Sequence, residues 1–130
     1  MAEFGKTRDI SVMGYCDNIA DYYAVADIFI YAPVKEGMPN ALLEAMASGL
    51  PCVVTKFMGL SKDFGDDYNH YLLAEETPEG LSEKVIKLLE ETDLRQYISN
   101  NASTLMQKTM SMNRIIDRYY DLYRNLTKAD

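Results

Sequence analysis

Two short apolar runs constrain the fold of this chain more than any other feature. Residues 28–32 (IFIYA) and 52–54 (CVV) are continuous, rich in β-branched or aromatic side chains, and too short for helices. Such runs are typical of strands that are buried on both faces, as in a parallel sheet. Segments with helical spacing separate and follow them, and this alternation indicates a parallel sheet flanked by helices. We therefore expect an α/β fold with a doubly wound, Rossmann-like sheet and C-terminal helices.

Local patterns predict the remaining elements. Residues 10–13 and 71–74 are expected to be further strands. Gly49 and Pro51 end the helix before the run at 52–54, because glycine accepts a left-handed cap and proline cannot continue a helix. The apolar side of the last helix, near residues 112–126, is expected to be core, with a partner surface as the alternative. The expected helix starts are, in order, Asp17 or Asn18, Pro39, Thr77, Thr92 or Asp93, and Ser111.

Length and charge limit the class of protein. The 130 residues are expected to form one domain, with residues 1–5 as a remnant of cloning. No apolar run approaches the roughly 20 residues that cross a bilayer, and the N-terminus lacks a secretion signal, so a cytoplasmic protein is expected. A net charge of −7 argues against nucleic acid as a partner, because phosphate backbones need a basic face. Cys16 and Cys52 lack metal-ligand spacing and are expected to be reduced thiols.

The loop that follows the run at residues 28–32 carries the candidate site. Ligands of doubly wound sheets bind beyond the carboxyl ends of the strands, where loops lead into helix N-termini. The amides of a first helical turn have no partner inside the helix, and the helix dipole favours an anion beside them. Gly37 permits close backbone approach to a ligand, and Asn40 can donate or accept hydrogen bonds.

Two glutamates flank this loop and helix start. Asn40 and Glu44 are four residues apart, so they share a helix face. A carboxylate at Glu44 can accept hydrogen bonds from both hydroxyls of a ribose, as an acidic residue does in dinucleotide-binding folds. Glu36, at the tip of the loop, would then lie near the group that the phosphates carry. The predicted order of the ligand is ribose, diphosphate, sugar.

These residues belong to a longer motif. Residues 36–44 form a Glu-x7-Glu pattern, which Tyr22-Tyr23-x3-Asp27 precedes and LLEAMA-x-G-x-P, from Leu42 to Pro51, overlaps and extends. With this string the chain resembles retaining glycosyltransferases of family 4 from about Val12 to Leu126. The resemblance implies the GT-B fold, with this chain as its C-terminal nucleotide-sugar-binding domain. It also implies a hexosyltransferase activity in polysaccharide or glycan biosynthesis.

The resemblance further implies a role for each residue of the site. Glu36 would contact the donor sugar and is the predicted catalytic residue, and Glu44 would bind the ribose of the nucleotide. Family members need no divalent metal, so no metal and no cofactor are expected beside the nucleoside-diphosphate sugar, which is the substrate. The predicted donor-binding residues are Gly37, Met38, Pro39, Asn40, Leu43 and Glu44.

The chain departs from the family pattern at the sugar end of the site. An acceptor-binding N-terminal domain, or a partner chain, is expected to complete the enzyme, and weak or no activity is expected of this chain alone. The family also supplies an Arg and a Lys to the diphosphate from a stretch that this sequence lacks, and Lys35, Lys56 and Lys62 are the candidate replacements. The departures are Ala32-Pro33 for Pro-Ser, Met58-Gly59 for Gly-Gly, Lys62 for Glu, and His70 for Gly.

Other hypotheses stay open on the sequence alone. A non-catalytic nucleotide-binding or assembly module would keep the fold without the chemistry. A response-regulator-like phosphate binder would need an acidic cluster at the strand tips, which the pattern lacks. His70 is expected to be structural or exposed, and the aspartates at 63, 66 and 67 to form a solvated loop. A homodimer through the last helix, and peripheral membrane association through the complete enzyme only, complete the expected partners.

Overall fold

The computed structural model describes residues 9–127, and a three-stranded parallel sheet lies at its centre. Its strands are β1 (Phe29–Tyr31), β2 (Cys52–Thr55) and β3 (Leu72–Ala74), in the order β1-β2-β3. In this register Val53 lies between Ile30 on one side and Leu72 on the other. All four residues of β2 are buried, so β2 is the central strand of the core. The α/β class with a parallel sheet is confirmed; residues 1–5 lie outside the described residues.

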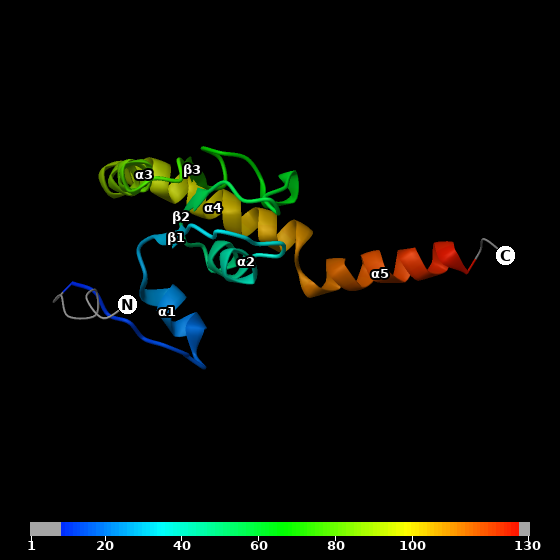
Figure 1. The fold of residues 1–130 in the computed structure, drawn as a ribbon. Helices are drawn as coiled ribbons and strands as arrows, with labels where there is room; N and C mark the ends of the chain where they lie inside the picture. The colour runs from blue at the N-terminus through cyan, green and yellow to red at the C-terminus, as the bar shows by residue number, and fades with distance from the viewer. Residues whose placement is uncertain (1–8, 128–130) are drawn as a thin grey trace.

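Helices cover both faces of the sheet (Figure 1). On one face Cys52 and Val54 pack with the second helix and the end of the fourth, whereas Val53 and Leu72 pack with the third helix and the start of the fourth. Within residues 9–127 the helices are α1 (Ile19–Val25), α2 (Asn40–Ala47), the 3-10 turn η2 (Lys62–Phe64), α3 (Pro78–Glu90), α4 (Thr92–Thr109) and α5 (Met112–Leu126).

The expected helix boundaries agree with the structure. The Thr77 hydroxyl accepts a hydrogen bond from the Gly80 amide at 3.0 Å, and Pro78 occupies the first turn of α3. Gly49 has a φ of 78°, which allows the chain to leave α2 and turn into β2. The starts of α1, α2, α4 and α5 all fall within one residue or two of the predicted positions.

The strand predicted at residues 10–13 is wrong. These residues form neither a helix nor a strand, and Val12 is 76 % exposed. The segment runs away from the sheet (Figure 1), so no neighbouring strand pairs with its backbone groups. A strand needs such a partner as well as a pattern of apolar side chains.

The expectation that residues 28–32 are buried on both faces is also wrong. β1 is an edge strand in the part of the chain that the structure describes, and Ile30 is 50 % exposed. The apolar run is continuous, but burial on both faces requires a layer on each side, and Ile30 has none.

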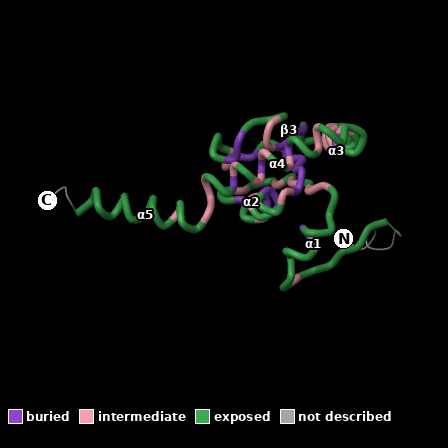
Figure 2. Tube along the Cα trace, turned by 180° about the vertical axis from the view of Figure 1, so that it is seen from behind, coloured by how far each residue is buried: buried purple, intermediate pink, exposed green. Residues whose placement is uncertain are grey.

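The last helix is not core. α5 projects from the body of the protein (Figures 1 and 2), and none of its residues is buried. Its apolar side, which includes Tyr120, Tyr123 and Leu126, is more than half exposed at each of these residues. Helical periodicity identifies an apolar side without identifying what covers it. The alternative of a partner surface stays a prediction.

Within residues 9–127, every helix is too short or too polar to cross a membrane.

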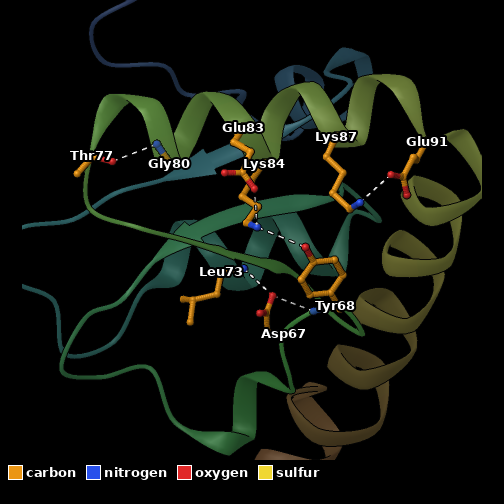
Figure 3. A network of polar contacts seen from close by, with 9 residues as sticks. All are labelled: Asp67, Tyr68, Leu73, Thr77, Gly80, Glu83, Lys84, Lys87 and Glu91. Carbon is orange, nitrogen blue, oxygen red and sulfur yellow. Dashed lines mark hydrogen bonds and ion pairs between the residues drawn. The ribbon is translucent and has the colours of Figure 1, made fainter.

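The acidic loop before β3 is held by its own side chains (Figure 3). Asp67 accepts hydrogen bonds from the amides of Tyr68 and Leu73 at 2.9 and 2.7 Å. The ammonium groups of Lys84 and Lys87 on α3 lie 5.5 and 5.9 Å from the centre of the Tyr68 ring. These contacts join the loop to α3 and support a structural, solvated role for this segment.

His70 has a structural role, as expected. Its Nδ1 accepts a hydrogen bond from the amide of Asp66 at 3.1 Å, and its ring fills the space in which a Cβ at Gly65 would lie. Gly65 also has a φ of 91°, a backbone conformation that residues other than glycine rarely adopt.

The cap of α3 provides a test of this description. Thr77→Ala removes the hydroxyl that accepts from Gly80, so we expect the free energy of unfolding to fall by about 1 kcal/mol in urea denaturation. Thr104→Ala, at an exposed position of α4, is the matched control and should change the stability by no more than about 0.5 kcal/mol. Equal effects of the two substitutions would show that the cap contributes nothing.

Candidate functional site

The candidate site lies where the loop from β1 leads into α2. Leu42, Ala45 and Met46 are fully buried, and they pack the inner side of α2 against the core. Pro39, which precedes the helix, is also buried. The start of α2 therefore has a fixed position at the carboxyl end of the sheet, and its exposed side faces outward from there.

Glu36 is held by three hydrogen bonds. Its Oε2 accepts from the hydroxyl of Tyr31 at 2.8 Å. Its Oε1 accepts from the amides of Gly37 and Met38 at 3.0 and 3.2 Å. These donors, with the Tyr31 hydroxyl first, lower the pKa of Glu36 below its usual value. Glu36 is therefore ionised at neutral pH and accepts hydrogen bonds rather than donating them.

The amides of the loop before α2, and that of the first residue of α2, are not free. Those of Gly37 and Met38 donate to the Glu36 carboxylate, Pro39 has no N–H, and the Asn40 amide donates to the carbonyl of Met38 at 2.9 Å. Residue spacing could not reveal this, because it depends on the side chain of Glu36 folding back over its own loop. The carboxylate thus occupies the place where an anion was expected.

Glu44 has a different environment. Its side chain is exposed on α2, and its Oε2 accepts from the hydroxyl of Tyr23 at 3.3 Å. Burial raises the pKa of Tyr23, and the charge and hydrogen bond of Glu44 raise it further. Tyr23 is therefore a neutral hydrogen-bond donor at physiological pH. Most of the acceptor capacity of Glu44 faces solvent and is available to hydroxyl groups of a ligand.

A row of aromatic rings connects the two glutamates. Tyr23 packs edge-on against Phe29, with ring centres 5.9 Å apart, and Phe29 stacks on Tyr31 at 6.1 Å. Tyr31 packs edge-on against Phe57 at 5.7 Å. The first ring of this row binds Glu44 and the third binds Glu36. The two carboxylates are therefore tied to one packed layer, two ring positions apart, and not to opposite surfaces.

The loop after β2 supports the same site from the other side. A Cβ placed at Gly59 would lie 2.5 Å from the backbone carbonyl oxygen of Gly37 and 3.2 Å from the backbone carbonyl oxygen of Glu36. Only a glycine at position 59 therefore permits this close approach. At Gly37, by contrast, a Cβ would meet nothing within 4 Å, so space beside this residue is open to a ligand.

A cavity of about 660 Å³ lies beside Gly37 and Met38, within the size range of ligand pockets. Its other walls come from Gly59, Ser61, Asp63 and Phe64, from Met110 at the end of α4, and from one side of α5. Arg118 of α5 is the cationic side chain of this lining, and Lys35, Lys56 and Lys62 are not part of it. Sequence reasoning missed Arg118 because only the tertiary structure brings α5 to the loop.

Comparison with known proteins identifies the family. Residues 1–105 match the family model described as glycosyl transferases group 1. The chain belongs to this family.

Several relatives agree with this assignment. An N-acetyl-alpha-D-glucosaminyl L-malate synthase from Bacillus anthracis is 26 % identical, over 91 % of this chain and 31 % of that protein. The N,N'-diacetylbacillosaminyl-diphospho-undecaprenol alpha-1,3-N-acetylgalactosaminyltransferase of Campylobacter jejuni is 30 % identical, over 97 % of this chain and 33 % of that protein. The chain thus spans about a third of the length of these relatives.

Solved structures confirm the fold. The Anabaena protein HepE, solved in complex with UDP-glucose, superposes with a TM-score of 0.80 at 18 % identity, over 93 % of this chain and 34 % of that chain. The family and fold class predicted from the sequence are therefore confirmed for this glycosyl transferases group 1 domain.

The four other predicted donor-binding residues of this glycosyl transferases group 1 domain fall into two groups, one exposed and one packed beneath the loop. Met38 and Asn40 are exposed and can contact a ligand directly. Pro39 is buried and Leu43 packs partly against the core, so these two support the loop from beneath. Their roles in donor binding stay predictions. Between residues 9 and 127 no three His, Cys, Asp or Glu side chains are placed to hold a metal ion; the expected independence from metals and cofactors also stays a prediction.

The contact at Gly59 can be tested by substitution. Gly59→Ala forces a methyl group against the backbone of Glu36 and Gly37, so we expect a loss of stability of about 1–3 kcal/mol and a displaced Gly37 amide signal in NMR spectra. Gly37→Ala, which meets open space, is the control and should leave the fold intact. If Gly59→Ala changed neither stability nor the Gly37 signal, the two loops would not pack as described.

Proposed function

We propose that this chain is the donor-binding part of a retaining glycosyltransferase that transfers a sugar from a nucleoside-diphosphate sugar. The observation that carries the proposal is the pair of glutamates around the start of α2, each held by its own tyrosine from one aromatic row. Membership of the glycosyl transferases group 1 family supports the interpretation of this pair as residues that bind a sugar nucleotide.

Each part of the site has a distinct task in this proposal. Glu44, exposed on α2, accepts hydrogen bonds from the ribose hydroxyls. The diphosphate lies between the two glutamates, where the dipole of α2 favours negative charge and Arg118 lines the adjoining cavity. Fixed positive groups at this place stabilise the diphosphate as it leaves with its bonding electrons. Glu36, ionised, orients the sugar and does not serve as a proton donor.

The named relatives support this class of donor. The Bacillus anthracis relative is named as the synthase of an N-acetylglucosaminyl malate, and the Campylobacter jejuni relative is named as an N-acetylgalactosaminyltransferase. The Anabaena neighbour was solved with UDP-glucose. Because the chain spans a third of such proteins, we propose that an acceptor domain or partner chain completes the enzyme, that this chain alone is weakly active or inactive, and that the enzyme acts in the cytoplasm without a metal.

A second candidate is a non-catalytic nucleotide-binding or assembly module. The occupied amides of Gly37 and Met38 favour it, because a phosphate at these amides would have to displace the Glu36 carboxylate. Nucleotide titration separates the two candidates in part, since a working donor site must bind a nucleoside diphosphate.

The first test is the affinity for nucleoside diphosphates. Glu44→Ala removes the proposed acceptor of the ribose hydroxyls, so we expect the dissociation constant of the preferred nucleotide among UDP, GDP and ADP to rise roughly tenfold in isothermal titration calorimetry. Glu90→Ala, an exposed residue of α3, is the matched control and should leave the constant unchanged. Absence of binding of all three nucleotides to the unaltered protein at about 1 mM would contradict the proposed function.

A further inference from the structure

We propose that Tyr31 is a positioning residue, which fixes the Glu36 carboxylate as the acceptor for one hydroxyl group of the donor sugar. This inference rests on the proposed function and assigns the recognition of the sugar, as distinct from the nucleotide, to the Tyr31–Glu36 pair. The juxtaposition that carries it is the 2.8 Å hydrogen bond from the end of β1 to the loop that leads into α2.

The ring of Tyr31 has little freedom to move. It stacks on Phe29 on one side and meets the edge of Phe57 on the other. Its backbone is paired with Val54 in the sheet. The hydroxyl therefore has a fixed position relative to the sheet, and the carboxylate that accepts from it takes its orientation from the core rather than from the exposed loop.

The number of donors around Glu36 leaves one acceptor position free. An ionised carboxylate offers about four lone-pair directions. The Gly37 and Met38 amides use those of Oε1, and the Tyr31 hydroxyl uses one of Oε2. The remaining direction on Oε2 can accept one more hydrogen bond, and Glu36 is only partly buried. A sugar hydroxyl can take this position without displacing any of the three donors.

The protonation states of the pair agree with this role. Burial, together with the hydrogen bond to Glu36 and the charge of its carboxylate, raises the pKa of Tyr31 to about 12. The same hydrogen bond lowers the pKa of Glu36. The proton therefore stays on the phenol at neutral pH, and Glu36 remains an acceptor for hydroxyl groups. A carboxylate in this state discriminates against a donor whose sugar lacks the matching hydroxyl.

The two oxygens of Glu36 depend on different parts of the chain. Oε1 is held by two backbone amides of its own loop, and these donors do not depend on the side chains of the residues that carry them. Among residues 9–127, Tyr31 is the one donor to Oε2. Loss of the Tyr31 hydroxyl therefore leaves Oε2 without its donor and the carboxylate less firmly oriented, while the helix start and Glu44 stay in place. The expected consequence is weaker recognition of the sugar with unchanged recognition of the nucleotide.

Tyr31→Phe tests this inference, because it keeps the packed ring and removes only the hydroxyl. The probes are UDP, GDP, UDP-glucose, UDP-N-acetylglucosamine and GDP-mannose, titrated calorimetrically into the 130-residue chain. For the sugar nucleotide that the unaltered chain prefers, we expect Tyr31→Phe to weaken binding by about tenfold and to change binding of the matching nucleoside diphosphate by less than about twofold. The pKa of Glu36, followed by NMR, should rise, since the largest cause of its lowering is removed.

The controls separate this inference from the proposed function. Tyr120→Phe, an exposed residue of α5 outside the cavity, should change none of these quantities, and circular dichroism should show Tyr31→Phe folded. Equal weakening of the nucleotide and the sugar nucleotide, or an unchanged pKa of Glu36, would overturn the role of Tyr31 while the donor site stood. No binding of any probe to the unaltered chain would instead overturn the proposed function and, with it, this inference.

Discussion

The packing of α2 against the sheet is the constraint on which the candidate site depends. Leu42, Ala45 and Met46 have no exposed surface, and Ser99 of α4 bonds to the Gly49 carbonyl at the far end of the helix. Burial of three side chains in one helix of eight residues leaves it no room to slide or rotate. The opposite side of α2, which carries Glu44, is therefore presented in one orientation, and the loop before it has a fixed end point.

Local electrostatics at the site differ from the charge of the whole chain. The protein carries a net charge of −7, yet it is expected to bind a diphosphate. A short-range arrangement can achieve this, because a helix dipole and one guanidinium act over a few ångströms, whereas distant carboxylates are screened by water and salt. The amides of Gly37 and Met38 are already used by the Glu36 carboxylate, so they hold this side chain in place.

The apolar surfaces that are exposed in the described residues include one on the sheet and one on the last helix. One is the outer edge of β1, where Ile30 is half exposed, and the other is the apolar side of α5. One side of α5 also lines the cavity beside Gly37, so this helix belongs to the surroundings of the site as well as to the outer surface. The relatives of this domain are about three times its length.

The sequence by itself determined the family, the parallel α/β class and the helix boundaries, because these depend on local signals. Thr77 with Pro78, Gly49 with Pro51, and the motif from Glu36 to Pro51 each act within a few residues of the backbone. The structure alone decided which apolar segments are covered: residues 10–13 find no neighbouring strand, and α5 finds no layer to pack against. It also decided that Tyr31 and Tyr23 hold the two glutamates, that Glu36 occupies the amides expected to be free, and that Arg118 lies beside the loop. These features arise from contacts between distant segments or from the rotation of one side chain, and neither periodicity nor spacing along the chain contains that information.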